Sequence, residues 1–187
     1  MENYFVEVCN SVPDFPIYLY NIPQCSANDL PVDVAEKVAK RCANAIGIKY
    51  SFADINKTID YLNINDGDFS VLHGLDRALV SLLAAGCEGT VSGISCVFPE
   101  PFIATYKAYM EGDLKKAQAH QKVCVQFCDA LKRGSNMSYF KEALKLRGIN
   151  GGFMRAPQIN IESAEIEDLK NVLEEICQRA HIPFKLS

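Results

Sequence analysis

Short apolar runs alternate with longer amphipathic segments along the first part of the chain. The runs predict buried strands at residues 15–20, 45–50, 69–73 and 90–94. Apolar residues that recur every three or four positions predict helices at residues 1–11, 31–42, 54–62 and 76–85. Strands joined by crossovers of about ten or more residues pair in parallel, with right-handed connections. The pattern therefore predicts an α/β fold.

The strand pattern stops after Pro99. The remaining apolar periodicity predicts helices at residues 101–110, 113–133, 138–146 and 164–180. A Gly151-Gly152 turn and an extended Arg155–Pro157 passage separate the last two. No low-complexity linker interrupts the chain, so we expect one structural domain.

The strand at residues 45–50, Ala-Ile-Gly-Ile-Lys-Tyr, places a charge in an apolar setting. Strand alternation puts Ile46 and Ile48 on one face, and Gly47 and Lys49 on the other. Burial disfavours an ammonium group and lowers its pKa toward the range in which the free amine attacks a carbonyl. Lys49 is therefore a candidate Schiff-base lysine. The alternative is a lysine that reaches solvent or pairs with a carboxylate.

Composition narrows the class of protein. The chain has 187 residues, of which 49% are hydrophobic, and a net charge of −4. These values favour a globular domain with a substantial core, and no basic run indicates a nucleic-acid partner. The N-terminus lacks the features of a signal peptide, and no apolar run reaches the length of a membrane span. We expect a soluble, cytoplasmic protein.

Eight cysteines raise the question of disulfides or a metal site. Six lie within apolar helical patterns and read as small core residues of a protein in a reducing compartment: Cys9, Cys42, Cys87, Cys124, Cys128 and Cys177. Cys124 and Cys128 share a helix face, but a metal would need further ligands. We expect no bound metal.

Polar residues collect where the predicted strands end, and the carboxyl ends of parallel strands are where active sites form. They are Tyr20, Asn21, Lys49, Ser51, His73, Gly74, Asp76, Ser92 and Gly93. Each has an ordinary alternative. Tyr20 could be a core aromatic residue, Asp76 the N-cap of its helix, and Asn21 a turn residue.

The sequence Tyr20-Asn21-Ile22-Pro23, followed by Gly47-Ile48-Lys49, resembles the dihydrodipicolinate synthase / N-acetylneuraminate lyase family of Schiff-base aldolases. Further landmarks of this resemblance follow in order: Gly74-x-Asp76, Ala84–Gly89, Phe98-Pro99-Glu100, Gly112-Asp113 and Arg155-x-Pro157. The resemblance extends over essentially the whole chain.

The resemblance implies a (β/α)8 barrel with extra C-terminal helices, usually assembled as a homotetramer. By this comparison, residues 1–112 are the C-terminal half of a TIM barrel, with strands five to eight, and residues 113–187 are a helical extension of the same domain. The half of the barrel that holds the substrate carboxylate is absent from this sequence. Activity would therefore require the missing N-terminal half.

The resemblance also implies roles for individual residues. Lys49 would form the imine with pyruvate or another 2-keto acid, and Tyr20 would carry protons. Ser51 and Asp76 would bind substrate hydroxyls, while the Val91 carbonyl and Gly93 would also contribute to the substrate site. No cofactor is implied, because the protonated imine is itself the electron sink.

Departures from family patterns bear on the substrate. Cys25 stands where dihydrodipicolinate synthases carry an arginine for the aspartate-semialdehyde carboxylate, and Ser51 stands where they carry alanine. Sialic-acid lyases have glutamate where Arg77 follows Asp76, and a different run from that at residues 92–95. These differences favour a 2-keto-3-deoxy sugar acid, cleaved to pyruvate and an aldehyde. The alternatives are N-acetylneuraminate lyase and 4-hydroxy-tetrahydrodipicolinate synthase.

A hypothesis of another class remains open. Because the carboxylate-binding half is absent, the chain could be a catalytically inactive fragment or an interaction protein.

Overall fold

The computed structural model describes residues 1–185 of the chain. They form two compact units, Met1–Val91 (unit 1) and a second that begins at Ser92 (unit 2). This division follows contacts within the chain and does not test the boundary between half barrel and helical extension at residue 112, which stays a prediction.

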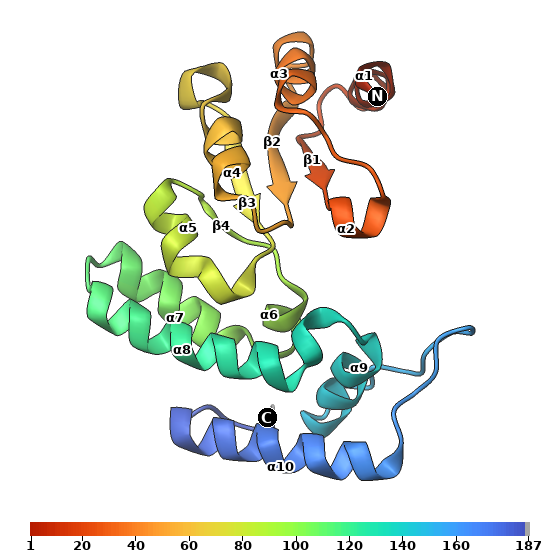
Figure 1. Ribbon diagram of the computed structural model, residues 1–187, viewed down its shortest axis with the longest axis vertical. Helices are drawn as coiled ribbons and strands as arrows, with labels where there is room; N and C mark the ends of the chain where they lie inside the picture. The colour runs from red at the N-terminus through yellow and green to blue at the C-terminus, as the bar shows by residue number, and fades with distance from the viewer. Residues whose placement is uncertain (186–187) are drawn as a thin grey trace. The chain divides into compact units, whose positions relative to one another are not determined.

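Unit 1 contains a four-stranded sheet in the order β1-β2-β3-β4, with every pair parallel. The strands are β1 (Ile17–Asn21), β2 (Ala45–Tyr50), β3 (Ser70–His73) and β4 (Gly89–Thr90). The helices between them are α1 (Glu2–Ser11), α2 (Pro23–Ser26), α3 (Val32–Arg41), α4 (Ile55–Leu62) and α5 (Leu79–Ala85), with short 3₁₀ helices η1 (Ile64–Gly67) and η2 (Asp76–Ala78). The alternation of strands and helices in Figure 1 confirms the predicted parallel α/β class.

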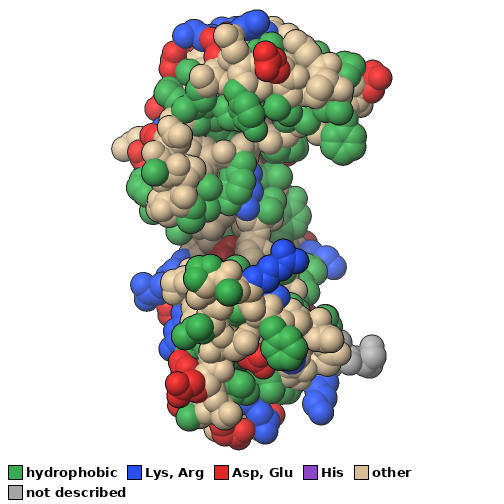
Figure 2. Space-filling view, turned by 90° about the vertical axis from the view of Figure 1, so that its right-hand side faces the viewer, with side chains coloured by type: hydrophobic (Ala, Val, Ile, Leu, Met, Phe, Trp, Pro, Cys, Tyr) green, Lys and Arg blue, Asp and Glu red, His purple; other side chains and the backbone are tan. Residues whose placement is uncertain are grey.

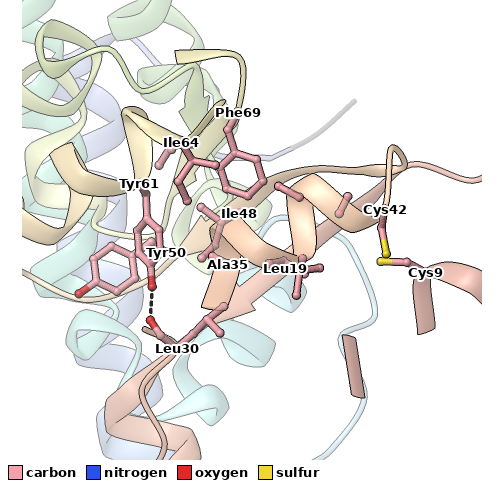
Figure 3. Close-up of a cluster of buried hydrophobic side chains, with 14 of the residues drawn as sticks. Cys9, Leu19, Leu30, Ala35, Cys42, Ile48, Tyr50, Tyr61, Ile64 and Phe69 are labelled. Atoms are coloured by element: carbon pink, nitrogen blue, oxygen red, sulfur yellow. Dashed lines mark hydrogen bonds between the residues drawn. The ribbon is translucent and has the colours of Figure 1, made fainter. Parts of the chain in front are cut away.

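The sheet turns one face toward its helices, where the core of unit 1 lies. Leu19, Ile48 and Val71 sit side by side on β1, β2 and β3, and all three are buried. Figure 3 shows Leu19 and Ile48 with Ala35 of α3 and with Tyr61 of α4 in the same cluster. Because side chains alternate along a strand, the residues before and after this row face the other way.

A bulge alters the predicted face of Ile46. Ile17 pairs with Ala45, but the next residue of β1, Tyr18, pairs with Gly47, which leaves Ile46 as an extra residue. Ile46 is 41% exposed and does not join Ile48 in the core. The prediction that these two isoleucines share a buried face was therefore wrong for Ile46.

Pro23 opens the short helix α2, because proline fits the first position of a helix. Another local prediction differs from the structure. The predicted strand at residues 90–94 ends at Thr90, and the chain then forms α6 (Gly93–Val97). Ser92 caps α6, since its hydroxyl oxygen accepts a hydrogen bond from the Ser95 amide at 3.1 Å.

Unit 2 is helical. Besides α6 it contains α7 (Pro99–Met110), α8 (Leu114–Ala130), the 3₁₀ helix η3 (Lys132–Gly134), α9 (Met137–Leu146) and α10 (Ser163–Ala180). Phe98 and Phe127 stack at 4.1 Å between ring centroids. The buried Arg147 guanidinium donates hydrogen bonds to the Glu100 carboxylate and the Val97 carbonyl. This charge is therefore paired, as a buried guanidinium requires.

The six cysteines predicted to be core residues are all buried, and each is a free thiol. Within residues 1–185 there is no cluster of three or more histidine, cysteine or acidic side chains placed to hold a metal ion. None of the helices in this range is long and apolar enough to cross a membrane.

Candidate active site

Tyr20 and Lys49 meet on the open face of the sheet, opposite the helices. They are partners in the register of β1 and β2, and Leu72 of β3 continues their row. The Lys49 Nζ lies 4.2 Å from the centroid of the Tyr20 ring, and Tyr20 is 48% exposed. Lys49 is half-buried and forms no ion pair with any described residue. The aromatic face is thus the group that holds the ammonium in place.

Ser51, Gly74 and Val91 lie one step closer to the carboxyl end of the sheet. The amide of each donates a hydrogen bond to the neighbouring strand: Ser51 to Asn21, Gly74 to Tyr50, and Val91 to His73. A Cβ on Gly74 would lie 2.1 Å from the Ser51 Oγ, so a side chain there would displace this hydroxyl. The Gln24 amide also donates to the Ser51 carbonyl at 2.8 Å. The Ser51 hydroxyl is therefore held close to the row that contains Lys49.

Two other predicted site residues lie beyond the strands. Asp76 is the first residue of η2 and is half-buried, and Leu75 takes the N-cap position, so the N-cap alternative for Asp76 was wrong. Gly93 is the first residue of α6 and belongs to unit 2. The substrate-binding roles of Ser51, Asp76, Val91 and Gly93 stay predictions.

A hydrogen-bonded chain crosses the open face in the row beneath Lys49. The Tyr18 hydroxyl donates a hydrogen bond to the Ser70 Oγ at 2.7 Å. The Ser70 hydroxyl in turn donates to the Glu88 carboxylate at 2.5 Å. A Cβ on Gly47 would lie 2.4 Å from the Ser70 carbonyl oxygen and 2.6 Å from the Tyr18 ring. Gly47 therefore leaves room for the Tyr18 ring across the strand that carries Lys49. Neither Ser70 nor Glu88 was predicted from the sequence to belong to the site.

Asn21 and His73 are at strand ends but face the helices. Asn21 is buried, and its amide donates to Asp29 and to the Tyr61 hydroxyl. The buried His73 accepts a hydrogen bond from the Leu75 amide at Nδ1. Neither side chain belongs to the open face with Lys49. Asn21 also does more than a turn residue would, because it links the loop after β1 to α4.

The pKa of His73 provides a test of this placement. Burial lowers it from 6.5 to about 4, so the ring is neutral when folded. Since the unfolded chain binds the proton more readily, the free energy of unfolding should fall as the pH drops from 6.5 to 4, by about 3 kcal/mol at about 1.36 kcal/mol per pKa unit. Above pH 6.5 this contribution is fully present.

NMR titration of the His73 ring in the folded protein measures this pKa directly. The bond from Leu75 leaves the proton on Nε2, which lies 3.3 Å from the Thr58 hydroxyl. We expect the Nε2–H tautomer down to about pH 5. A ring that titrates near its ordinary value would contradict the burial of His73.

Grooves in the two units differ in their relation to the candidate residues. In unit 1, a groove of about 460 Å³ is lined by Tyr20, Asn21, Ser26 and Phe5, among others. In unit 2, a groove of about 670 Å³ lies along α10, with Tyr139, Glu165 and Val172 in its wall. Only the groove in unit 1 includes a predicted catalytic residue. Figure 2 shows that the face it presents exposes hydrophobic side chains, in green, among polar and charged ones.

The sequence model of the Dihydrodipicolinate synthetase family matches residues 1–176. The chain belongs to this family. An uncharacterised DapA-like lyase of Halobacterium salinarum is 35% identical over 144 residues, which are 77% of this chain and 47% of that protein. A 4-hydroxy-tetrahydrodipicolinate synthase of Syntrophus aciditrophicus is 34% identical over 91% of this chain and 58% of its own length. The chain thus spans about half the length of the curated relatives that it matches.

Solved structures of the dihydrodipicolinate synthetase family share the fold. The 4-hydroxy-tetrahydrodipicolinate synthase of Methylacidiphilum fumariolicum SolV superposes with a TM-score of 0.85 at 27% identity, over 96% of this chain and 61% of that one. A prophage protein of the family from E. coli K12, solved in complex with pyruvate, superposes with a TM-score of 0.84 at 25% identity. The match covers 94% of this chain and 60% of that one. The matches confirm the family resemblance that the motifs predicted.

Proposed function

We propose that this chain is the catalytic half of a Schiff-base carbon–carbon lyase, and that its four strands are completed to a (β/α)8 barrel by an N-terminal half. The observation that carries the proposal is the pairing of Lys49 and Tyr20 on the open face, with Nζ 4.2 Å from the ring. An amine and a phenol at the carboxyl ends of adjacent parallel strands suit imine chemistry. The tetramer usual in the family is part of this proposal.

The proposed reaction begins when the neutral Lys49 amine attacks the C2 carbonyl of a 2-keto acid and loses water to form an imine. Protonated, the imine draws electrons from the C3–C4 bond. Tyr20, which has given its own proton to the hydroxyl that departs as water, takes the proton from the C4 hydroxyl as that bond breaks, which releases the aldehyde and leaves an enamine. Protonation at C3 and hydrolysis then release pyruvate and free Lys49. Covalent catalysis of this kind needs no metal or organic cofactor.

We propose a 2-keto-3-deoxy sugar acid, or a related hydroxylated 2-keto acid, as the substrate. The Ser51 hydroxyl, held over Gly74, offers a hydrogen-bonding group to such a substrate. Cys25 is exposed on α2 and supplies no cation for a semialdehyde carboxylate. The 4-hydroxy-tetrahydrodipicolinate synthase activity is a second candidate, because relatives with 31% and 34% identity carry that name.

The two candidates can be separated in the completed protein, by which we mean residues 1–187 joined to the N-terminal part of the Syntrophus aciditrophicus relative. We expect a higher kcat/KM for cleavage of a 2-keto-3-deoxy sugar acid than for condensation of pyruvate with aspartate semialdehyde. A charge-assisted hydrogen bond contributes roughly 1.5–3 kcal/mol. The Cys25→Arg variant should therefore raise semialdehyde efficiency about ten- to a hundredfold.

If the wild-type completed protein has a higher kcat/KM for semialdehyde condensation than for sugar-acid cleavage, the chain belongs to the synthase branch. Ser51→Ala, which keeps the size of the site and removes the hydroxyl, is the matched variant. It should weaken sugar-acid cleavage and leave semialdehyde condensation unchanged.

A further inference from the structure

The loop that follows Tyr20 is fixed by a hydrogen-bonded network on the far side of the sheet. The Asn21 amide nitrogen donates to Asp29 Oδ1 at 2.9 Å and to the Tyr61 hydroxyl at 3.0 Å. The Asn21 Oδ1 accepts a hydrogen bond from the Leu30 amide at 3.2 Å. Tyr61 in turn donates to the Leu30 carbonyl, a contact drawn in Figure 3. Each polar atom of the buried Asn21 side chain therefore has a partner.

Lys57 extends this network. Its Nζ lies 2.5 Å from Asp29 Oδ2, so the two carboxylate oxygens of Asp29 contact different residues. The hydrogen bond from Asn21, together with the ion pair to Lys57, lowers the pKa of Asp29 and keeps it charged. The Lys57 side chain is 15% exposed and that of Asp29 is 55% exposed. Asp29 thus connects the surface of the protein to the buried side-chain amide of Asn21.

The network joins the two segments that carry the candidate catalytic residues. Asn21 ends the strand of Tyr20 and Asp29 lies in the loop after it, whereas Lys57 lies on α4, which follows the strand of Lys49. The Asn21 main-chain carbonyl accepts a hydrogen bond from the Ser51 amide at 2.9 Å, next to the Tyr20–Lys49 row. The side chain of Asn21 is therefore held by hydrogen bonds on the helix side of the sheet, and its main chain forms the last hydrogen bond between the strands of Tyr20 and Lys49.

We propose that Asp29 and Lys57 are positioning residues, which hold Asn21 and thereby set the place of the Tyr20 hydroxyl relative to Lys49. This inference rests on the proposed function. The Asp29 carboxylate is 55% exposed, so solvent weakens its attraction to the mostly buried Lys57 side chain, and the value of the pair to the protein would be geometric. Loss of the Asp29 charge leaves Asn21 bonded to Tyr61 and Leu30, so the loop keeps its fold but gains freedom.

The test uses the completed protein and three variants of the network. Asp29→Asn and Lys57→Met each remove a charge with little change in size, and Lys57→Arg keeps the positive charge at position 57. Because misplacing a reacting group by about 1 Å can lower a rate about a hundredfold, we expect the first two variants to lose about ten- to a hundredfold in kcat. Lys57→Arg should stay within about threefold of wild type. The KM for the keto acid should change less than kcat.

A matched control is available on α3. Lys37 forms an exposed ion pair with Asp33 at 2.8 Å, and Lys37→Met removes the same charge away from the network. Its kcat should equal that of the wild type. Each kcat is divided by the fraction of Lys49 that borohydride traps with pyruvate, so unfolded molecules do not count. The final trapped fraction should be the same in every folded variant, because Lys49 itself is unchanged.

The outcomes distinguish the inference from the function beneath it. If wild-type protein traps no pyruvate, the proposed function is overturned and the positioning role with it. If trapping is complete and both charge-removing variants keep the wild-type kcat per trapped site, the positioning role alone is overturned. A loss in kcat that Lys57→Arg does not restore, or that Lys37→Met reproduces, also contradicts it.

Discussion

Residues 1–187 expressed on their own should not form a cooperatively unfolding monomer. Large side chains on or beside the open face of the sheet are 36–48% exposed: Tyr18, Tyr20, Ile46 and Val91. The outer edges of β1 and β4 have no partner strand within the described residues. Such edges and faces pair with other chains. If on the order of 1,000 Å² of apolar surface stays in water, roughly 25 kcal/mol of burial is lost. This exceeds the net stability of about 5–15 kcal/mol typical of a domain.

We expect the isolated chain to be insoluble, molten or paired with a second copy, and to show no aldolase turnover. The completed protein, in which the added strands should cover the face, should unfold cooperatively. In the isolated chain, Tyr18→Lys should reduce self-association, whereas Ile103→Lys on α7, where Ile103 is 50% exposed, should not. Sedimentation and calorimetry that show a monomer with one cooperative transition would contradict the expectation, as would cleavage of a 2-keto sugar acid by that monomer.

Replacing Lys49 by alanine in the completed protein should abolish turnover. The amine supplies the covalent intermediate, and loss of such a nucleophile lowers kcat by about 10⁴- to 10⁶-fold. Lys49→Arg should be equally inactive, because a guanidinium keeps the charge but does not form the imine. Both variants leave the ring of Tyr20 in place, so the fold should persist.

Steady-state cleavage of a 2-keto-3-deoxy sugar acid provides the measurement for Lys49. Lys37→Ala, which removes an exposed lysine of α3, is the control and should keep wild-type activity. Residual activity above a thousandth of wild type in Lys49→Ala would mean that another amine, or another mechanism, carries the reaction.

Much of unit 1 could be predicted because its elements follow local rules. The apolar stripe and Pro31 predict α3, and Asp54 caps α4 through the Lys57 amide as its position indicates. Two failures have physical causes that the local pattern does not contain. The bulge at Ile46 depends on how β1 and β2 align, which a single strand does not encode. The end of β4 depends on whether Ser92 caps a helix or continues a strand.

The candidate site divides in the same way. Lys49 and Tyr20 could be found because strand alternation and strand ends place them on one face, and the structure pairs them in register. Asp29 and Lys57 could not, because their contact links residues 28 positions apart through a buried asparagine. His73 was misplaced because a position at the end of a strand does not tell which face of the sheet the side chain is on. The pairing of His73 with Tyr50, whose side chain is on the helix side, does tell it.

The most direct test of the central claim is to find which lysine forms the imine. The completed protein is incubated with pyruvate, reduced with borohydride and digested, and the modified peptide is located by mass spectrometry. We predict one reduced pyruvyl group for each chain, on Lys49, and none in Lys49→Ala. A pyruvyl group on any other lysine, or labelling unchanged in Lys49→Ala, would contradict the assignment of Lys49 as the Schiff-base residue.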